Sequence, residues 1–467
     1  MMARLEKVSF YLLLGLIFWL PIPLASNRVW AWSIAEVWVS VQSTLLMISY
    51  MPKERQFPFA RVWRYAWLLI PLTLFQIWVA IQLIPLSFSQ LAIVSPNAVE
   101  LFQNAGSSHG YISLDTHATK TALVKGITYT LFAFNVAVLV YTTFRLKQVL
   151  YTVVLSGAFQ AFYAAIAVLL GWEQSLVFGF KEVGVATGSF VYKNHLANYL
   201  MMCLVLGIGL IIAQLHISPS GSWFERLRRW GEGIVSRKMF VRLALVIMVI
   251  ALVMTRSRMG NTAFFAATTL GGLAALAFYK YKPRAMVPLI VSLIIVDTVV
   301  VGAVFGLDKV KERLEQTSVL KETRDEVIEW SLPIVSGFPL TGTGMGSFYT
   351  IFPRYTQFNI GYYDHAHNDY LQFAVEAGLP ATLLLGFAWI WAIYLTVRSM
   401  SKRNSKTLRG TALGCLMGLI GMLMHISVDF NLQAPANAMT FVLLLVLAGS
   451  TASIQIVRPK ETSEIVQ

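Results

Sequence analysis

The sequence HLANYLMMCLVLGIGLIIAQ, residues 195–214, contains no Asp, Glu, Lys or Arg in twenty consecutive positions. An α-helix of that length is about 30 Å long, which matches the hydrocarbon core of a lipid bilayer. This stretch therefore predicts a membrane-spanning helix. Other stretches of the chain can be compared with it in length and in charge.

Comparable apolar stretches occur along the whole chain. Of its 467 residues, 57% are hydrophobic and only 13% are charged, whereas about 25% are charged in an ordinary soluble domain. A soluble globular protein is thereby excluded. We identify twelve expected spans, at residues 9–25, 29–50, 65–85, 121–144, 148–171, 195–214, 239–256, 259–279, 285–305, 377–398, 410–428 and 435–455.

The predicted fold class is an all-α polytopic membrane protein with about 12 transmembrane helices and a large periplasmic loop. Residues 1–305 hold the first nine spans, with short loops and a periplasmic segment at 86–120. The large loop covers residues 306–376. Residues 377–467 hold the last three spans and a short cytoplasmic tail.

The charge balance fits a membrane orientation. The chain has 37 Lys+Arg against 23 Asp+Glu, a net charge of +14, which in a soluble protein would suggest nucleic acid. Most of these basic residues fall in the short loops on one side when the N-terminus is cytoplasmic, as the positive-inside rule requires. Both termini are therefore expected in the cytoplasm, and no nucleic-acid partner is expected. Cys203 and Cys415 lie inside apolar stretches, which excludes a disulfide framework or zinc ribbon.

Polar residues gather in four clusters on the expected external face. One contains Lys193 and His195, and the next contains Arg256 and Arg258. The third cluster lies in the large loop and contains Arg324, His365, His367, Asn368 and Asp369. The fourth lies at the end of the eleventh span and contains His425 and Asp429.

Each cluster also has a purely structural interpretation. Arg256 could extend to lipid headgroups, Lys193 and His195 could begin a helix, and His425 could pair with Asp429. For Arg258, in a tight turn between two spans, we favour a bound anion. The glycines of the run 342–346 do not follow a strand, so we reject a dinucleotide-binding loop and expect a hinge instead.

The large loop carries a possible metal site. His365, His367 and Asp369 alternate along the chain, and on an extended strand such residues could converge on one ion. A helix beginning near Asp369 would break that geometry, so we favour a site without a metal. A histidine beside arginines at an aqueous boundary is then a suitable general base, since its ordinary pKa is near 6.5.

The segment His367–Asn368–Asp369–Tyr370–Leu371–Gln372, followed by Glu376–Ala377–Gly378–Leu379–Pro380, resembles the signature of the bacterial O-antigen ligase/polymerase superfamily. Other landmarks are similar in order and spacing, and together they cover about residues 185–435: Gly188–Ser189–Phe190, Asn194–His195–Leu196–Ala197, Ser257–Arg258, Trp330 and Phe338–Pro339–Leu340–Thr341–Gly342–Thr343–Gly344.

The resemblance implies a membrane-embedded, GT-C-like glycosyltransferase that is inverting and independent of metal. It would take a glycan from undecaprenyl diphosphate at the periplasmic face of the bacterial inner (cytoplasmic) membrane. Because the donor is already activated, no cofactor is expected. The essential histidine of the family falls on His367 and its external arginines fall on Arg258 and Arg324.

The full set of expected site residues follows from the resemblance and the clusters. The expected catalytic residue is His367. The donor diphosphate is expected to bind to Arg258, Arg324, Lys193 and Arg256, since guanidinium groups bind such oxygens in pairs. The expected supporting residues are His195, Asn368, Asp369 and Asp429. The acceptor is lipid A–core in a ligase, which we favour narrowly, or a growing lipid-linked glycan in a polymerase. A transporter of the same lipid is less favoured, because transporters place ionisable residues near the membrane midplane.

Overall fold

The computed structural model describes residues 2–52, 56–181, 184–215, 237–283, 286–288, 291–292, 295 and 324–455. Within these ranges the chain is helical and contains no β-strand. The α-helices are α1 (Met2–Trp19), α2 (Val29–Ile48), α3 (Phe59–Trp63), α4 (Ala66–Ile81), α5 (Phe88–Val94), α6 (Pro96–Asn104), α7 (Thr116–Leu139), α8 (Thr143–Leu169), α9 (Lys193–Gln214), α11 (Arg237–Met254), α12 (Arg258–Phe278), α15 (Arg324–Gly337), α16 (Phe348–Ile351), α17 (Asp369–Ala377), α18 (Leu379–Lys402), α19 (Lys406–His425) and α20 (Pro435–Ser453). Three short 3-10 helices are η1 (Leu24–Ser26), η2 (Phe352–Tyr355) and η3 (Asn431–Gln433).

Eight of these helices are long and apolar enough to cross a membrane, which confirms the all-α polytopic fold class: α2, α7, α8, α9, α12, α18, α19 and α20. Three further expected spans correspond to α1, α4 and α11. Helix α4 is only 16 residues long. Helix α1 has Arg4, Glu6 and Lys7 near its start, and α11 begins with Arg237 and Lys238. The ninth expected span, 285–305, lies almost entirely outside the described residues.

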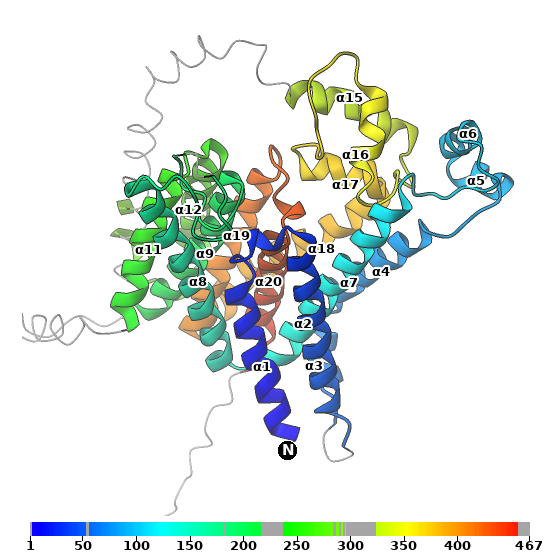
Figure 1. Ribbon diagram of the computed structural model, residues 1–467. Helices are drawn as coiled ribbons and strands as arrows, with labels where there is room; N and C mark the ends of the chain where they lie inside the picture. The colour runs from blue at the N-terminus through cyan, green and yellow to red at the C-terminus, as the bar shows by residue number, and fades with distance from the viewer. Residues whose placement is uncertain are drawn as a thin grey trace, which may run out of the picture.

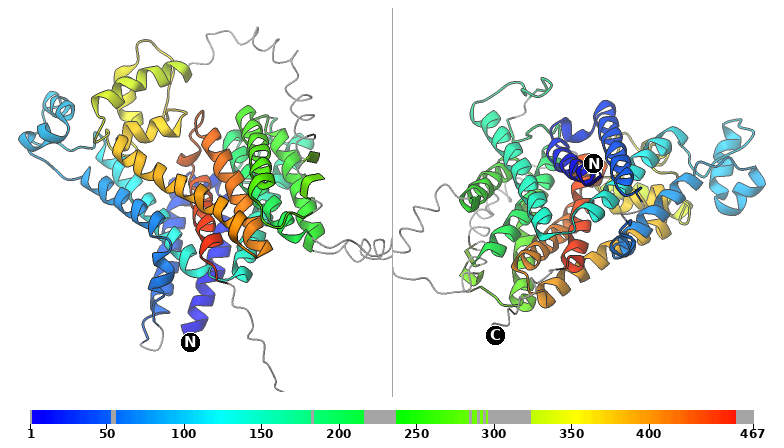
Figure 2. Two further views of the ribbon diagram at one scale, coloured as in Figure 1. Left: turned by 180° about the vertical axis from the view of Figure 1, so that it is seen from behind. Right: turned by 90° about the horizontal axis from the view of Figure 1, so that it is seen from below.

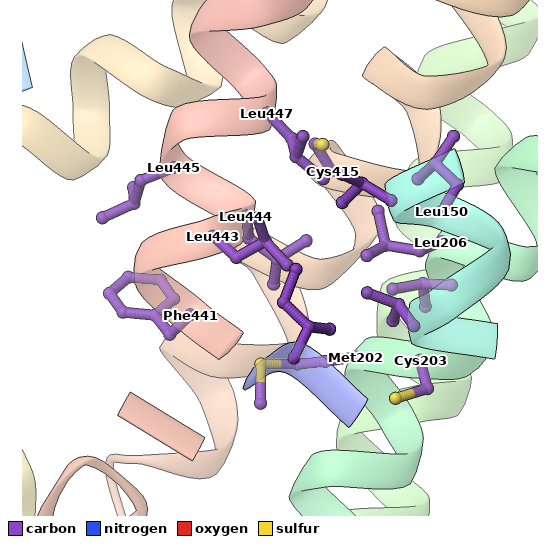
Figure 3. Packing of buried hydrophobic residues seen from close by; sticks show 14 of the residues in the cluster. Leu150, Met202, Cys203, Leu206, Cys415, Phe441, Leu443, Leu444, Leu445 and Leu447 are labelled. Atoms are coloured by element: carbon purple, nitrogen blue, oxygen red, sulfur yellow. The ribbon is translucent and has the colours of Figure 1, made fainter. Parts of the chain in front are cut away.

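Helices α9, α19 and α20 form the centre of the bundle (Figures 1 and 2). Helices α9 and α19 cross closely because glycines meet there: a Cβ atom on Gly209 would lie 2.3 Å from the carbonyl oxygen of Gly410. Small residues permit such approaches between membrane helices. Figure 3 shows Cys203 and Cys415 among the buried apolar side chains, and both are free thiols.

Charged contacts place several chain segments at one end of the bundle. Arg145, near the start of α8, forms an ion pair of 2.9 Å with Glu6 of α1. Arg64, just before α4, donates a 2.8 Å hydrogen bond to the carbonyl oxygen of Ser453 at the end of α20. Helices α15, α16 and α17 lie at the opposite end from the N-terminus (Figure 1).

The described part of the large loop is folded and has its own apolar core. Side chains from α15, α16 and η2 are buried together with Leu91, Ala98 and Ile112 of the first external segment. Short helices of this kind depend on tertiary packing, because isolated helices of that length are marginal in water. The two external segments that were expected as separate loops therefore form one unit.

The glycine-rich turn at 342–346 is packed tightly in this conformation, and the expected hinge stays a prediction. Gly342 and Gly344 have φ of 64° and 103°, values that L-residues with a side chain rarely adopt. A Cβ atom on Gly342 would lie 2.3 Å from the carbonyl oxygen of Glu376. The Glu376 carboxylate accepts hydrogen bonds from the backbone N–H groups of Gly346 (2.9 Å) and Phe348 (3.3 Å). The turn thus supports the start of α18 through close backbone contact.

Candidate functional site

His367 lies at the end of the large loop, one residue before the N-cap of α17. The cap is Asn368, whose side-chain oxygen accepts a 3.1 Å hydrogen bond from the Leu371 backbone N–H, as helix N-caps require. His367 itself has φ of 50°. A positive φ is uncommon outside glycine and occurs most often where the surroundings fix it. The backbone at the start of α17 therefore holds His367 in an uncommon conformation.

The ring of Phe430 is the centre around which the site residues gather. The ring centroid of His365 is 4.6 Å away in a stacked arrangement, and that of His367 is 4.7 Å away at 90°. His195 approaches to 4.9 Å at 85°, and Tyr192 stacks at 5.5 Å. Three histidines from two distant parts of the chain thus contact one aromatic side chain.

Asp429 lies between two of the histidines. Its carboxylate is 3.9 Å from Nδ1 of His367 and 4.0 Å from Nε2 of His425, which is too long for a hydrogen bond. The same carboxylate accepts a 2.9 Å hydrogen bond from the Phe430 backbone N–H. His425 instead lies 3.1 Å from the amide nitrogen of Asn198. Burial raises the pKa of Asp429, although the hydrogen bond from Phe430 opposes this shift.

Arg324 connects the loop unit to the start of α9. Its Nη2 lies 3.4 Å from the hydroxyl of Tyr192, which also accepts a 3.1 Å hydrogen bond from Asn194. Burial is the main cause that lowers the pKa of His367 to about 4, and the positive charge of Arg324 acts in the same direction. The imidazole of His367 is consequently neutral near pH 7 and able to accept a proton.

Asp369 is buried and joins α17 to the connection between α19 and α20. Its carboxylate accepts hydrogen bonds from the Leu432 backbone N–H (2.9 Å) and from the Gln433 side chain (3.0 Å). Burial raises the pKa of Asp369 to about 8 despite these hydrogen bonds. The residue fixes the segment that carries Asp429 and Phe430 relative to the segment that carries His367.

Arg256 and Arg258, the arginines of the second cluster, have no described contact with His367. The side chains of Arg256 and Arg258 are exposed, and neither guanidinium has a hydrogen-bond or ion-pair partner among the residues that the structure describes. Ser257 between them caps α12 by accepting a hydrogen bond from Gly260. Lys193 is the half-buried first residue of α9. Arg324, Asp429 and His195 are thus brought to His367, whereas no described contact brings Arg256 or Arg258 there.

Sequence reasoning missed Phe430 and the polar face of α17. The Gln372 side chain donates to Nδ1 of His365 and to the Glu376 carboxylate, both at 3.1 Å. Residues 369, 372 and 376 follow the spacing of one helix face, and this pattern was available in the sequence. Nothing in the sequence distinguishes Phe430 from an ordinary core residue.

The geometry of the possible metal site differs from the extended arrangement considered above. In the part of the chain that the structure describes, no group of three His, Cys, Asp or Glu side chains is placed to hold a metal ion. Asp369 lies in a helix, and its carboxylate bonds to Leu432 and Gln433. His365 and His367 instead share contact with Phe430.

Residues 243–386 match the family model described as O-antigen ligase. The matched range includes Arg258, Arg324 and His367, and it supports membership of the O-antigen ligase family, as the motifs predicted. No curated protein matches the chain. The family supports a glycosyltransferase of the ligase or polymerase type that acts on lipid-linked glycans within a membrane.

Proposed function

We propose that this chain, whose residues 243–386 match the O-antigen ligase family, transfers a glycan from undecaprenyl diphosphate to lipid A–core at the periplasmic face of the bacterial inner membrane. The transfer inverts the anomeric centre and needs no metal. The observation that carries this proposal is the arrangement around His367. A neutral imidazole lies 3.9 Å from a buried carboxylate and close to the charge of Arg324.

His367 acts as the general base in the proposed reaction. It accepts the proton of the acceptor hydroxyl while that oxygen forms a bond to the anomeric carbon of the donor sugar. The bond between the anomeric carbon and the phosphate oxygen breaks, and its electron pair leaves with the lipid diphosphate. Asp429 stabilises the imidazolium that forms. A single displacement of this kind inverts the configuration at the anomeric carbon.

Arginines replace a metal ion at the leaving group in this proposal. Arg324 already acts electrostatically on His367, and the exposed guanidinium of Arg258 is available to bind phosphate oxygens. Planar guanidinium groups bind two such oxygens at once and neutralise the developing charge. Lys193 and Arg256 add positive charge at the same face.

A polymerase is the alternative within the family, since it would use the same donor site with a lipid-linked repeat as acceptor. The test is a reconstituted assay with the purified chain, a lipid-linked glycan and either acceptor. We expect a single glycan to appear on lipid A–core. Lipid-linked products that grow in steps would identify a polymerase, and unchanged substrates with both acceptors would refute the proposed transfer.

A further inference from the structure

Two charged residues lie inside the apolar helices, away from the helix ends. Glu36 of α2 is the only Asp or Glu in the eight described helices that are suited to span a membrane, and Lys125 of α7 is their most deeply placed cation. With a rise of 1.5 Å per residue, Glu36 is about 11 Å and Lys125 about 14 Å from the first residue of its helix. Ionisable residues at such positions are energetically expensive and usually have a function.

The ammonium group of Lys125 has no hydrogen-bond partner among the described residues. Its Nζ lies 3.6 Å from the centroid of the Trp32 ring, and Glu36 interacts with it electrostatically. No hydrogen-bond acceptor in the described part of the chain contacts its three N–H donors. Trp32 and Glu36 therefore hold the charge in place and leave its hydrogen-bonding capacity unused.

Lys125 follows the part of α7 that packs against α17. Ala122 and Leu123, on the preceding turn of α7, share an apolar cluster with Phe373 of α17. Burial lowers the pKa of His365, and the charge of Lys125 contributes to this shift. Arg324 acts on His367 from the loop unit. The charges of two cations thus act on two neighbouring histidines, one from a membrane helix and one from the external unit.

We propose that Lys125 binds the phosphate that is joined directly to the prenyl chain of the lipid-linked donor. This inference rests on the proposed function. The prenyl chain lies in the hydrocarbon region and the glycan lies outside it, so the two phosphates occupy successive depths. The deeper phosphate meets the cation that comes from the membrane, and the outer phosphate meets the arginines. An ammonium is a compact point charge that suits a phosphate with few other polar neighbours.

The test measures binding without transfer, using the purified full chain in detergent. The probes are farnesyl diphosphate, farnesyl monophosphate and inorganic pyrophosphate. Lys125→Met is expected to weaken binding of both farnesyl probes at least about tenfold, the loss typical of a charge-assisted hydrogen bond. Lys125→Arg keeps the charge and should bind within about threefold of the wild type. Lys120→Met is the matched control, because Lys120 is an exposed lysine of the same helix.

Two further measurements keep the result interpretable. Lys125→Met leaves Glu36 without its partner, so the double variant Lys125→Met/Glu36→Gln is measured with it, and thermal melting checks that each variant is folded. Equal affinity of the wild type and the folded Lys125 variants for farnesyl diphosphate would overturn the inference and leave the proposed function intact. Equal weakening by Lys120→Met would also overturn it. A wild type that binds no prenyl diphosphate would refute the proposed donor as well.

Discussion

Phe430 shows how one apolar side chain can organise a polar site. Its ring contacts His195, His365 and His367 within 5 Å between centroids. Its backbone N–H also binds Asp429. Aromatic contacts of this kind orient rings as well as bury them. We therefore expect Phe430 to determine how the imidazole of His367 faces the acceptor, without touching the substrate itself.

The variant Phe430→Leu tests this positioning role. It should lower kcat by about tenfold or more and change KM for the donor little, because small misplacements of a catalytic group slow the chemical step strongly. Phe430→Tyr retains the ring and should recover most of the rate. Phe358→Leu is the control, since Phe358 is an exposed aromatic residue of the large loop. An unchanged kcat in Phe430→Leu would show that the ring is only packing.

The lowered pKa of His367 predicts the pH dependence of transfer. A general base must be neutral, and burial together with Arg324 lowers its pKa to about 4. The acid limb of kcat/KM should therefore lie near pH 4, well below the ordinary histidine value of about 6.5. Arg324→Gln removes a positive charge and should move this limb to higher pH. A limb near pH 6.5 in the wild type, or a shift to lower pH in Arg324→Gln, would contradict the assignment.

The sequence predicted many of the residues that meet at the site but not how they meet. His195, Arg324, His367 and Asp429 were selected because each lies on the expected external face, and the structure brings them together. Arg258 was selected on the same ground, but no described contact connects it with His367. Because residues on the same membrane face share only their depth in the membrane, the sequence could not predict which of them lie next to one another.

At the scale of elements, the spans were predictable because the bilayer imposes their length and apolarity. Backbone groups in hydrocarbon must be satisfied within a helix, so local composition suffices to find them. The glycine-rich turn was not predictable in this way. Gly378 has φ of 83°, and a Cβ there would lie 2.4 Å from the Leu340 carbonyl oxygen. Such contacts between distant segments require glycine for closeness, although the sequence pattern is the same as that of a hinge.

Asp369 joins α17 to the connection between α19 and α20 through its hydrogen bonds. Its titration predicts that the stability of the folded protein depends on pH. Buried Asp369 has a pKa of about 8 in the folded state, against about 4 in an unfolded chain. Between these values the folded state binds more protons, so its stability is highest at low pH and falls as pH rises through 8. Melting temperatures at pH 5, 7 and 9 should decrease in this order, after correction with Asp369→Asn. Equal pH dependence in the wild type and Asp369→Asn would show that Asp369 does not titrate in this range.

At the scale of the whole molecule, the charges divide between two ends. Arg64 and Arg145 bind at the end that contains Glu6 of α1 and the end of α20. His367 and Asp429 lie beside the start of α17, which is at the other end (Figure 1). This arrangement agrees with the proposed reaction at one membrane face, in which the donor would enter from the bilayer and the acceptor from outside.

The transfer rate of His367→Ala tests the central claim most directly. The variant is compared with the wild type and with His109→Ala, which changes an exposed histidine of the first external segment. Reconstituted protein, lipid-linked glycan and acceptor are used at saturating concentrations, and melting confirms that each variant is folded. Loss of a general base should lower the rate by about 10²–10⁴-fold, while His109→Ala remains close to the wild type. A folded His367→Ala variant that retains more than about a tenth of the wild-type rate would contradict the account.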